Sequence, residues 1–435
     1  MDPAFAGSRR SVTCRAPGKL FIAGEYAVVE PGNLAVLTAV DRYATATVTD
    51  TSADAAPTVW RHRTGGSAPT TDSDGRRDAA RSTGRDDDSH AAITSRADGA
   101  RHAVVPTGGD SVAASSGITL RSDLDGGVSL ACDRAGDRLV PATPDGAVPA
   151  AFAYVFAAVS VVEQLRVARE IPARPCDVAI STDLGDADGR KYGLGSSAAV
   201  TVATVAALGR FHGLELTAMQ RYRLAVLATI TVNPRASGGD VAASTWGGWL
   251  AYGSPDRGAV AEIAARDGID AALRAPWPGL SVHPLPTPAG LTLRVGWTGN
   301  PASTPALVGA ATWARGDRTV FHARSNDCVR RLSTAIEADD AAAVRAEIDC
   351  ARELLLGLDD TARLGIMTPR LRALCAAGAA VGAAAKPSGA GGGDCGIAVI
   401  ERTRTTALAE LTDRWVAAGI RPLPLRTHPR EGEDS

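Results

Sequence analysis

The sequence predicts an α+β protein of two domains that meet near residue 255. Short β-rich segments alternate with helical segments in both halves of the chain, and this strand-then-helix grouping restarts after Ser254. Hydrophobic residues make up 45% of the 435 residues, which is enough to bury a sizeable core in each half. No internal repeat is visible, so the two halves are not expected to be copies of one unit.

The first predicted domain, residues 12–255, begins with strand material on both sides of a Pro17-Gly18 turn. Its expected strands are residues 12–16, 19–29, 34–37, 42–48, 117–124, 128–131 and 176–182. Helical periodicity follows at residues 150–169, 198–208 and 217–231. Residues 1–11 are expected to be a disordered N-terminus. Between about residues 62 and 110 the chain is rich in Gly, Ser, Thr, Asp and Arg, which predicts a disordered insertion.

The second predicted domain, residues 256–427, contains more helix than strand, and a short tail is expected at 428–435. Strands are predicted at residues 291–297, 396–400 and 421–425. Helices are predicted at residues 303–314, 319–337, 341–356, 369–384 and 405–419.

Composition and charge point to a protein that handles small molecules. A formal net charge of −2 gives no electrostatic reason to expect nucleic acid or an anionic membrane as a partner. The N-terminal residues lack the apolar centre of a signal peptide, so a cytoplasmic location is expected. The 7 cysteines form no CxxC pair or metal-like spacing and are interpreted as reduced thiols.

The stretch KYGLGSSAAV, residues 191–200, combines a glycine loop with the start of an apolar helix. Helix N-termini carry unpaired N–H groups that favour a negative charge, and glycines let the backbone close around phosphate oxygens. Residues Lys191, Gly193, Leu194, Gly195, Ser196, Ser197 and Ala198 are therefore candidates for phosphate binding. A tightly packed helix start capped by serine remains the alternative.

Lysine is rare in this chain, and each copy lies in a glycine-containing motif. It occurs only as Lys19 in APGK, Lys191 in KYGLGSS and Lys386 in KPSGAGGG, while arginine supplies the remaining positive charge. A lysine ammonium is a compact point charge that the planar arginine fork does not reproduce. These three positions are therefore predicted to need lysine.

Three further motifs accompany the glycine loop. APGKLFIAGEYAVV places Lys19 after a rigid turn, NPRASGGDVAASTWGG places Asp240 near the start of a small-residue helix, and KPSGAGGGDCGIAV is a glycine loop that leads into a strand. Taken singly, they are ordinary structural features: a surface lysine, an N-cap and a flexible loop.

Together, and in this order, the four motifs resemble the galactokinase, homoserine kinase, mevalonate kinase and phosphomevalonate kinase (GHMP) superfamily. The resemblance implies an N-terminal ribosomal protein S5 domain 2-like, ATP-binding domain and a C-terminal ferredoxin-like domain. It implies that residues Lys191 and Gly193–Ala198 bind ATP, that Lys19 and Asp240 are catalytic, and that Mg²⁺ is held by Ser197, with Ser196 as the alternative. It assigns the acceptor to Lys19, Tyr26, Ser303, Thr304, Gly389, Ala390 and Gly391.

Within the superfamily, several segments are similar to phosphomevalonate kinases of the bacterial type. These are VGWTGNPASTPALV, GGGDCGIA, SNDCVRRL and VVEQL, and Tyr26 stands where mevalonate kinase-like chains usually carry histidine. The implied substrates are ATP and 5-phosphomevalonate. Mevalonate kinase, another GHMP small-molecule kinase, mevalonate diphosphate decarboxylase and a non-catalytic binding protein remain alternatives. The role of Asp240, as base or as electrostatic partner of Lys19, and the formation of a homodimer remain open.

Overall fold

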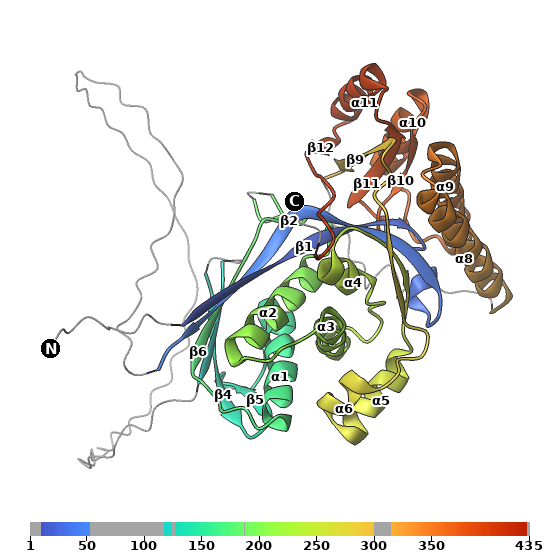
Figure 1. The fold of residues 1–435 in the computed structure, drawn as a ribbon. Helices are drawn as coiled ribbons and strands as arrows, with labels where there is room; N and C mark the ends of the chain where they lie inside the picture. The colour runs from blue at the N-terminus through green and yellow to red at the C-terminus, as the bar shows by residue number, and fades with distance from the viewer. Residues whose placement is uncertain (1–9, 53–116, 124–126, 187, 300–314, 433–435) are drawn as a thin grey trace, which may run out of the picture. The chain divides into compact units, whose positions relative to one another are not determined.

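Two β-sheets, each with helices against it, make up the described part of the chain (Figure 1). The computed structural model describes residues 10–52, 117–123, 127–186, 188–299 and 315–432. The predicted insertion, the first nine residues and the predicted helix at 303–314 lie outside these ranges. Mixed strand and helix content confirms the α+β prediction.

The first sheet has 8 strands in the order β5-β4-β3-β6-β2-β7-β8, with β1 paired to β2 beside this path. All its strand pairs are antiparallel except β3 with β6. The strands are β1 (Ser11–Ala23), β2 (Leu34–Asp50), β3 (Ile118–Ser122), β4 (Ser129–Ala135), β5 (Arg138–Pro141), β6 (Cys176–Thr182), β7 (Trp249–Gly253) and β8 (Ser281–Leu285).

The predicted turn at Pro17-Gly18 is wrong, because β1 runs through it without a break. β1 pairs with β2 along its whole length, and the pairing register shifts between Pro17 and Gly18. A bulge of this kind tolerates a proline, which has no N–H for the ladder. The two predicted strands at 34–37 and 42–48 are likewise one strand, since pairing with β1 on one side supports the residues between them. Residues Ala27–Val29, predicted as strand, form a 3-10 helix, η1.

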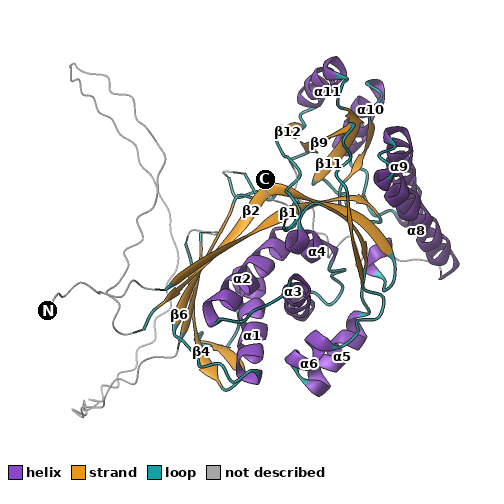
Figure 2. Cartoon of the chain, in the orientation of Figure 1, coloured by secondary structure: helices purple, strands orange, loops and turns teal. Residues whose placement is uncertain are grey.

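One helical layer packs against the first sheet (Figure 2). It contains η3 (Ala150–Phe152), α1 (Ala153–Ala168), α2 (Ser196–His212), α3 (Ala218–Val232) and α4 (Gly239–Trp246). α2 is buried around nearly all of its circumference, as expected for a helix of Ala, Val, Leu and Thr. A capping box of Thr217 and Gln220 starts α3.

The segment Ala150–Ala168 is long and apolar enough to cross a membrane by length and composition alone. Its helix instead packs against α2 and α3, and more than half of the segment is buried. Core helices meet the same composition test, and α1 carries the buried charged residues Glu163 and Arg166.

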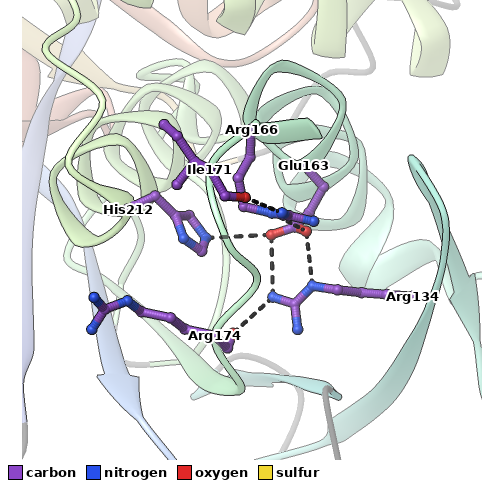
Figure 3. Close-up of polar contacts among 6 residues, drawn as sticks. All are labelled: Arg134, Glu163, Arg166, Ile171, Arg174 and His212. Carbon is purple, nitrogen blue, oxygen red and sulfur yellow. Dashed lines mark hydrogen bonds and ion pairs between the residues drawn. The ribbon is translucent and has the colours of Figure 1, made fainter. Parts of the chain in front are cut away.

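A buried ion network fixes α1 to α2 and to strand β4 (Figure 3). The Glu163 carboxylate accepts hydrogen bonds from Arg134 Nε at 2.8 Å and from Arg166 Nε at 2.9 Å. His212 Nε2 at the end of α2 lies 3.3 Å from the same carboxylate. Burial alone would raise the pKa of Glu163, but His212 and the two arginines hold it at about 2. Glu163 is therefore charged throughout the physiological range.

The first sheet continues past residue 255, where the sequence predicts a domain boundary. Helices α5 (Arg257–Asp267) and α6 (Ile269–Arg274) follow, and strand β8 then returns to pair with β7. The second sheet begins only with β9 at Leu291. The extents of the two domains stay a prediction.

The second sheet has 4 antiparallel strands in the order β10-β11-β9-β12. Its strands are β9 (Leu291–Trp297), β10 (Ala384–Pro387), β11 (Cys395–Glu401) and β12 (Arg421–Leu423). Helices α9 (Ala341–Ala362), α10 (Pro369–Ala380) and α11 (Thr405–Ala417) pack against this sheet, whereas α8 (Arg315–Glu337) packs against α9 and contacts β2 of the first sheet. The predicted helix at 369–384 is too long, because the helix ends at Ala380, the chain turns at Gly382 (φ 75°) and Ala384 already begins β10.

The predicted tail is attached to the first sheet at His428 and to helix α4 at Glu431. His428 N donates to Ala39 O at 2.9 Å, and Glu431 N donates to Trp246 O at 2.8 Å. Gly247 makes room for this segment, because a Cβ there would lie 2.2 Å from Pro429 O. Residues 428–431 therefore pack beside the helix that carries Asp240.

Candidate active site

The glycine loop ends at the first turn of α2, as the sequence predicts. Gly195 occupies the N-cap in the left-handed conformation (φ 78°), and no side chain caps the helix. Ser196, Ser197 and Ala198 are the first three helical residues, so their N–H groups have no partner within the helix. The serine-capped alternative is thereby wrong, and the helix start has the polarity that favours an anion.

Lys19 of β1 lies directly against this loop. Its backbone N–H donates to Leu194 O at 2.8 Å, and its Nζ donates to Gly193 O at 3.0 Å. Only 7% of the residue is exposed. A Cβ at Gly195 would lie 3.0 Å from both Cγ and Cε of Lys19, so the absence of a side chain at Gly195 lets the lysine pass.

Asp240 stands in the first turn of α4, as predicted. The helix starts after Gly238, which is left-handed (φ 81°), and Ser244 Oγ ties the helix to β1 by donating to Pro17 O at 2.7 Å. Burial raises the pKa of Asp240, while the charge of Lys19 opposes that increase. Within the described residues, the charge of Lys19 acts on Asp240 although no direct ion pair joins the two side chains.

The second glycine loop, Gly389–Gly391, comes from the second sheet and is held by the segment that follows Lys19. Tyr26 donates its hydroxyl to Ala390 O at 2.6 Å, and Ser388 Oγ both accepts from Phe21 N at 2.9 Å and donates to Phe21 O at 3.0 Å. A Cβ on Gly389 would lie 3.9 Å from Lys19 Nζ. The structure therefore brings the motifs APGKLFIAGEYAVV, KYGLGSSAAV and KPSGAGGGDCGIAV together around Lys19. Asp240, from the motif NPRASGGDVAASTWGG, interacts electrostatically with the same lysine.

The remaining predicted site residues divide into three groups. Ser303 and Thr304 lie outside the described residues. Lys191 is exposed, with its backbone bridged to Gly185. Ser197 lies beside Tyr154 of α1: burial and the charge of Asp240 raise the pKa of Tyr154, and the Ser197 side chain opposes that rise.

Three residues at the site were not assigned a role from the sequence. Asp394 packs its carboxyl group against Gly193, where a Cβ would lie 2.7 Å from its Oδ2. Glu25 and Lys386 form a buried ion pair beside the second loop. The rarity of lysine already marked Lys386, whereas Asp394 and Glu25 are single acids whose partners lie far away in the sequence.

A separate group of ligand-type atoms joins α8 to α9. Cys328, Glu347 and Cys350 place one such atom each within 4.8 Å of the others. Arg331 engages the Glu347 carboxylate through Nε at 2.6 Å and Nη2 at 2.9 Å. All 7 cysteines are free thiols, as expected. The arginine neutralises the carboxylate, so this group is not interpreted as a metal centre.

An uncapped helix start in a glycine loop, beside a lysine and a carboxylate, suits phosphoryl transfer, and the family models assign the chain to a class of kinases. The GHMP kinases N terminal domain matches residues 153–248, and the GHMP kinases C terminal domain matches residues 334–417. The phosphomevalonate kinase of Streptomyces sp. (strain CL190) is 44% identical over 424 residues, which cover 96% of this chain and 97% of that protein. The chain belongs to the phosphomevalonate kinase family of the GHMP kinases.

Solved structures share this fold across nearly the whole chain. The protein Lin0012 of Listeria innocua superposes with a TM-score of 0.75 at 28% identity, covering 97% of this chain and 99% of its own. The phosphomevalonate kinase of Streptococcus pneumoniae, solved with phosphomevalonate and AMPPNP, superposes with a TM-score of 0.70 at 24% identity. That match covers 96% of this chain and 99% of the other. The family models and the Streptomyces relative confirm the GHMP resemblance inferred from four short motifs.

Proposed function

We propose that this chain transfers the γ-phosphoryl group of ATP to the phosphate of 5-phosphomevalonate, giving 5-diphosphomevalonate and ADP. The 44% identity to the Streptomyces phosphomevalonate kinase over nearly the full length of both chains carries this assignment. The gathering of Lys19 and the two glycine loops supports it, since phosphoryl transfer requires alignment and charge neutralisation more than covalent chemistry. We further propose that it acts in the cytoplasm.

The acceptor is a phosphate monoester, which sets the demands on the site. Its second pKa is about 6, so at pH 7 most of the acceptor is already a dianion. A strong base is then unnecessary, and the main obstacle is repulsion between two anions. Lys19 and the N–H groups at the start of α2 are the groups proposed to offset that repulsion.

Asp240 is proposed to orient Lys19 and the acceptor. The raised pKa of its carboxyl group would also let it accept a proton from the minor fraction of acceptor that arrives as a monoanion. Ser303, Thr304 and the Gly389–Gly391 loop are proposed to bind the rest of the acceptor, with Tyr26 holding the loop through its hydroxyl.

Mg²⁺ is the expected companion of ATP, and the residues at the α2 start fit it. Hydroxyl and carboxylate oxygens are the ligands that Mg²⁺ prefers, and Ser197, Ser196 and Asp240 offer both kinds. Ser197 is the proposed ligand, with Ser196 as the alternative. When bound with the nucleotide, the ion would neutralise charge on the phosphates.

An ADP-release assay tests the assignment with three acceptors offered in parallel: mevalonate, 5-phosphomevalonate and 5-diphosphomevalonate. We expect ADP to be released at a high rate only with 5-phosphomevalonate. Preferred turnover of mevalonate would assign the chain to the alcohol kinases instead. Phosphate release with 5-diphosphomevalonate would indicate a decarboxylase, and silence with all three would indicate a binding protein.

A further inference from the structure

The ion pair Lys386–Glu25 joins a residue of the second sheet to the turn after β1 of the first sheet, 361 positions away in the sequence. Lys386 lies in β10 of the second sheet, and Glu25 follows β1 of the first. Neither side chain is accessible, with 0% and 3% of their surfaces exposed. The lysine ammonium donates to the Glu25 carboxylate and also to Pro387 O at 2.6 Å.

A gain in stability is a weak reason for such a pair. Taking two charges out of water costs several kcal/mol per ion, and buried pairs can often be replaced by apolar side chains without loss. A fully buried lysine is also unusual in a chain whose positive charge is almost entirely arginine. The pair does fix the orientation of both side chains, because each buried charge must keep its partner.

The ion pair also contacts the second glycine loop and helps to fix its position. The carboxylate oxygen that receives Lys386 also lies 3.4 Å from the backbone nitrogen of Gly389, the first residue of the loop. Tyr26, the neighbour of Glu25, holds the next residue through Ala390 O at 2.6 Å. Gly389 is in turn the loop residue that faces Lys19. One short segment after β1 thus fixes the loop relative to the lysine.

We infer that Lys386 and Glu25 are positioning residues for the acceptor: their pair sets the distance between the Gly389–Gly391 loop and Lys19. This inference rests on the proposed function, since it concerns the acceptor of that reaction. The nucleotide is assigned to the loop before α2, and within the described structure no side-chain hydrogen bond joins Lys386 or Glu25 to that loop. The pair should therefore control the KM for the acceptor and leave the KM for ATP unchanged.

The experiment compares Lys386→Met, Glu25→Gln and the double variant with the parent protein. KM and kcat are measured for ATP and for 5-phosphomevalonate separately, together with Tm. Glu163→Gln is the matched control, because Glu163 is a similarly buried, arginine-paired carboxylate outside the site. We expect each single variant to raise the acceptor KM at least tenfold while the ATP KM stays within twofold. The control should lower Tm and leave both KM values within twofold.

The double variant separates positioning from folding. It contains no unpaired buried charge, so its Tm should recover relative to Lys386→Met, while its acceptor KM stays raised. Recovery of the acceptor KM together with Tm would overturn the inference, as would equal changes in both KM values. If Lys386→Met does not fold, the acceptor KM values of Glu25→Gln and of the double variant still test the inference. A parent protein that does not use 5-phosphomevalonate would contradict the proposed function instead, which the parent assay shows by itself.

Discussion

Lys19 Nζ donates a hydrogen bond to the carbonyl oxygen of Gly193 at 3.0 Å, although the two residues are 174 positions apart. This contact places the Lys19 ammonium, carried by β1, beside the loop that precedes α2. A fixed ammonium beside an uncapped helix start concentrates positive potential at one point. The consequences of that arrangement can be tested at Lys19, Asp240 and Gly195.

Replacing Lys19 by alanine should lower kcat about a hundredfold, equivalent to a loss of about 3 kcal/mol of transition-state stabilisation. Lys19→Arg should restore little of it, because the close approach of Gly195 to Cγ and Cε leaves no room to reposition a planar guanidinium. The measurement is kcat with saturating ATP and 5-phosphomevalonate. An arginine variant with near-parental kcat would show that only the charge matters.

Asp240→Asn removes a charge while keeping the shape of the side chain. If the acceptor is a phosphate, the variant should be slow at pH 7 and lose part of its defect as pH rises, because the remaining monoanion ionises by itself. Rates from pH 6 to 9 with 5-phosphomevalonate and mevalonate test this expectation. A defect that is constant with pH, combined with turnover of mevalonate by the parent, would make Asp240 the base of an alcohol kinase.

Gly195→Val should abolish nucleotide binding. The native φ of 78° is unfavourable for a β-branched residue, and the new Cβ would lie 3.0 Å from two carbons of Lys19. Titration calorimetry with a non-hydrolysable ATP analogue measures the loss. Gly213→Val serves as the control: Gly213 is also left-handed (φ 72°) but ends α2, where a Cβ would meet nothing within 4 Å. Unchanged affinity in Gly195→Val would remove this loop from the phosphate site.

Acid should destabilise the fold through Glu163. Its folded pKa of about 2 lies below the ordinary 4.5, so its contribution is complete above pH 4.5 and is lost as pH falls toward 2. The shift corresponds to roughly 3 kcal/mol. Urea unfolding between pH 7 and pH 3 measures the free energy of unfolding. Glu163→Gln should be less stable at pH 7, and its free energy of unfolding should decrease less between pH 7 and pH 3. An equal decrease in both proteins would contradict this role of Glu163.

Local sequence patterns were sufficient to predict those elements whose structure depends only on residues close together in the sequence. Strands 176–182 and 291–297 were predicted with the observed bounds, because apolar runs between turn residues leave few alternatives. The loop at 193–198 and the helix start at Asp240 were predicted from glycine and small-residue patterns that act within a few positions. The clustering of all three lysines in glycine motifs marked Lys19 and Lys386 before any contact was known.

Tertiary structure decided everything that depends on a distant partner. Pairing with β2 turned the Pro17-Gly18 turn into a bulge within one strand, and pairing with β7 kept β8 in the first sheet. The ion pair of Glu25 with Lys386 and the packing of Asp394 on Gly193 have no local signature. A single acid in a sequence is compatible with many partners, and only the packing of two sheets selects one. The sequence determined which chemical groups this protein carries, and the fold determined which of them meet.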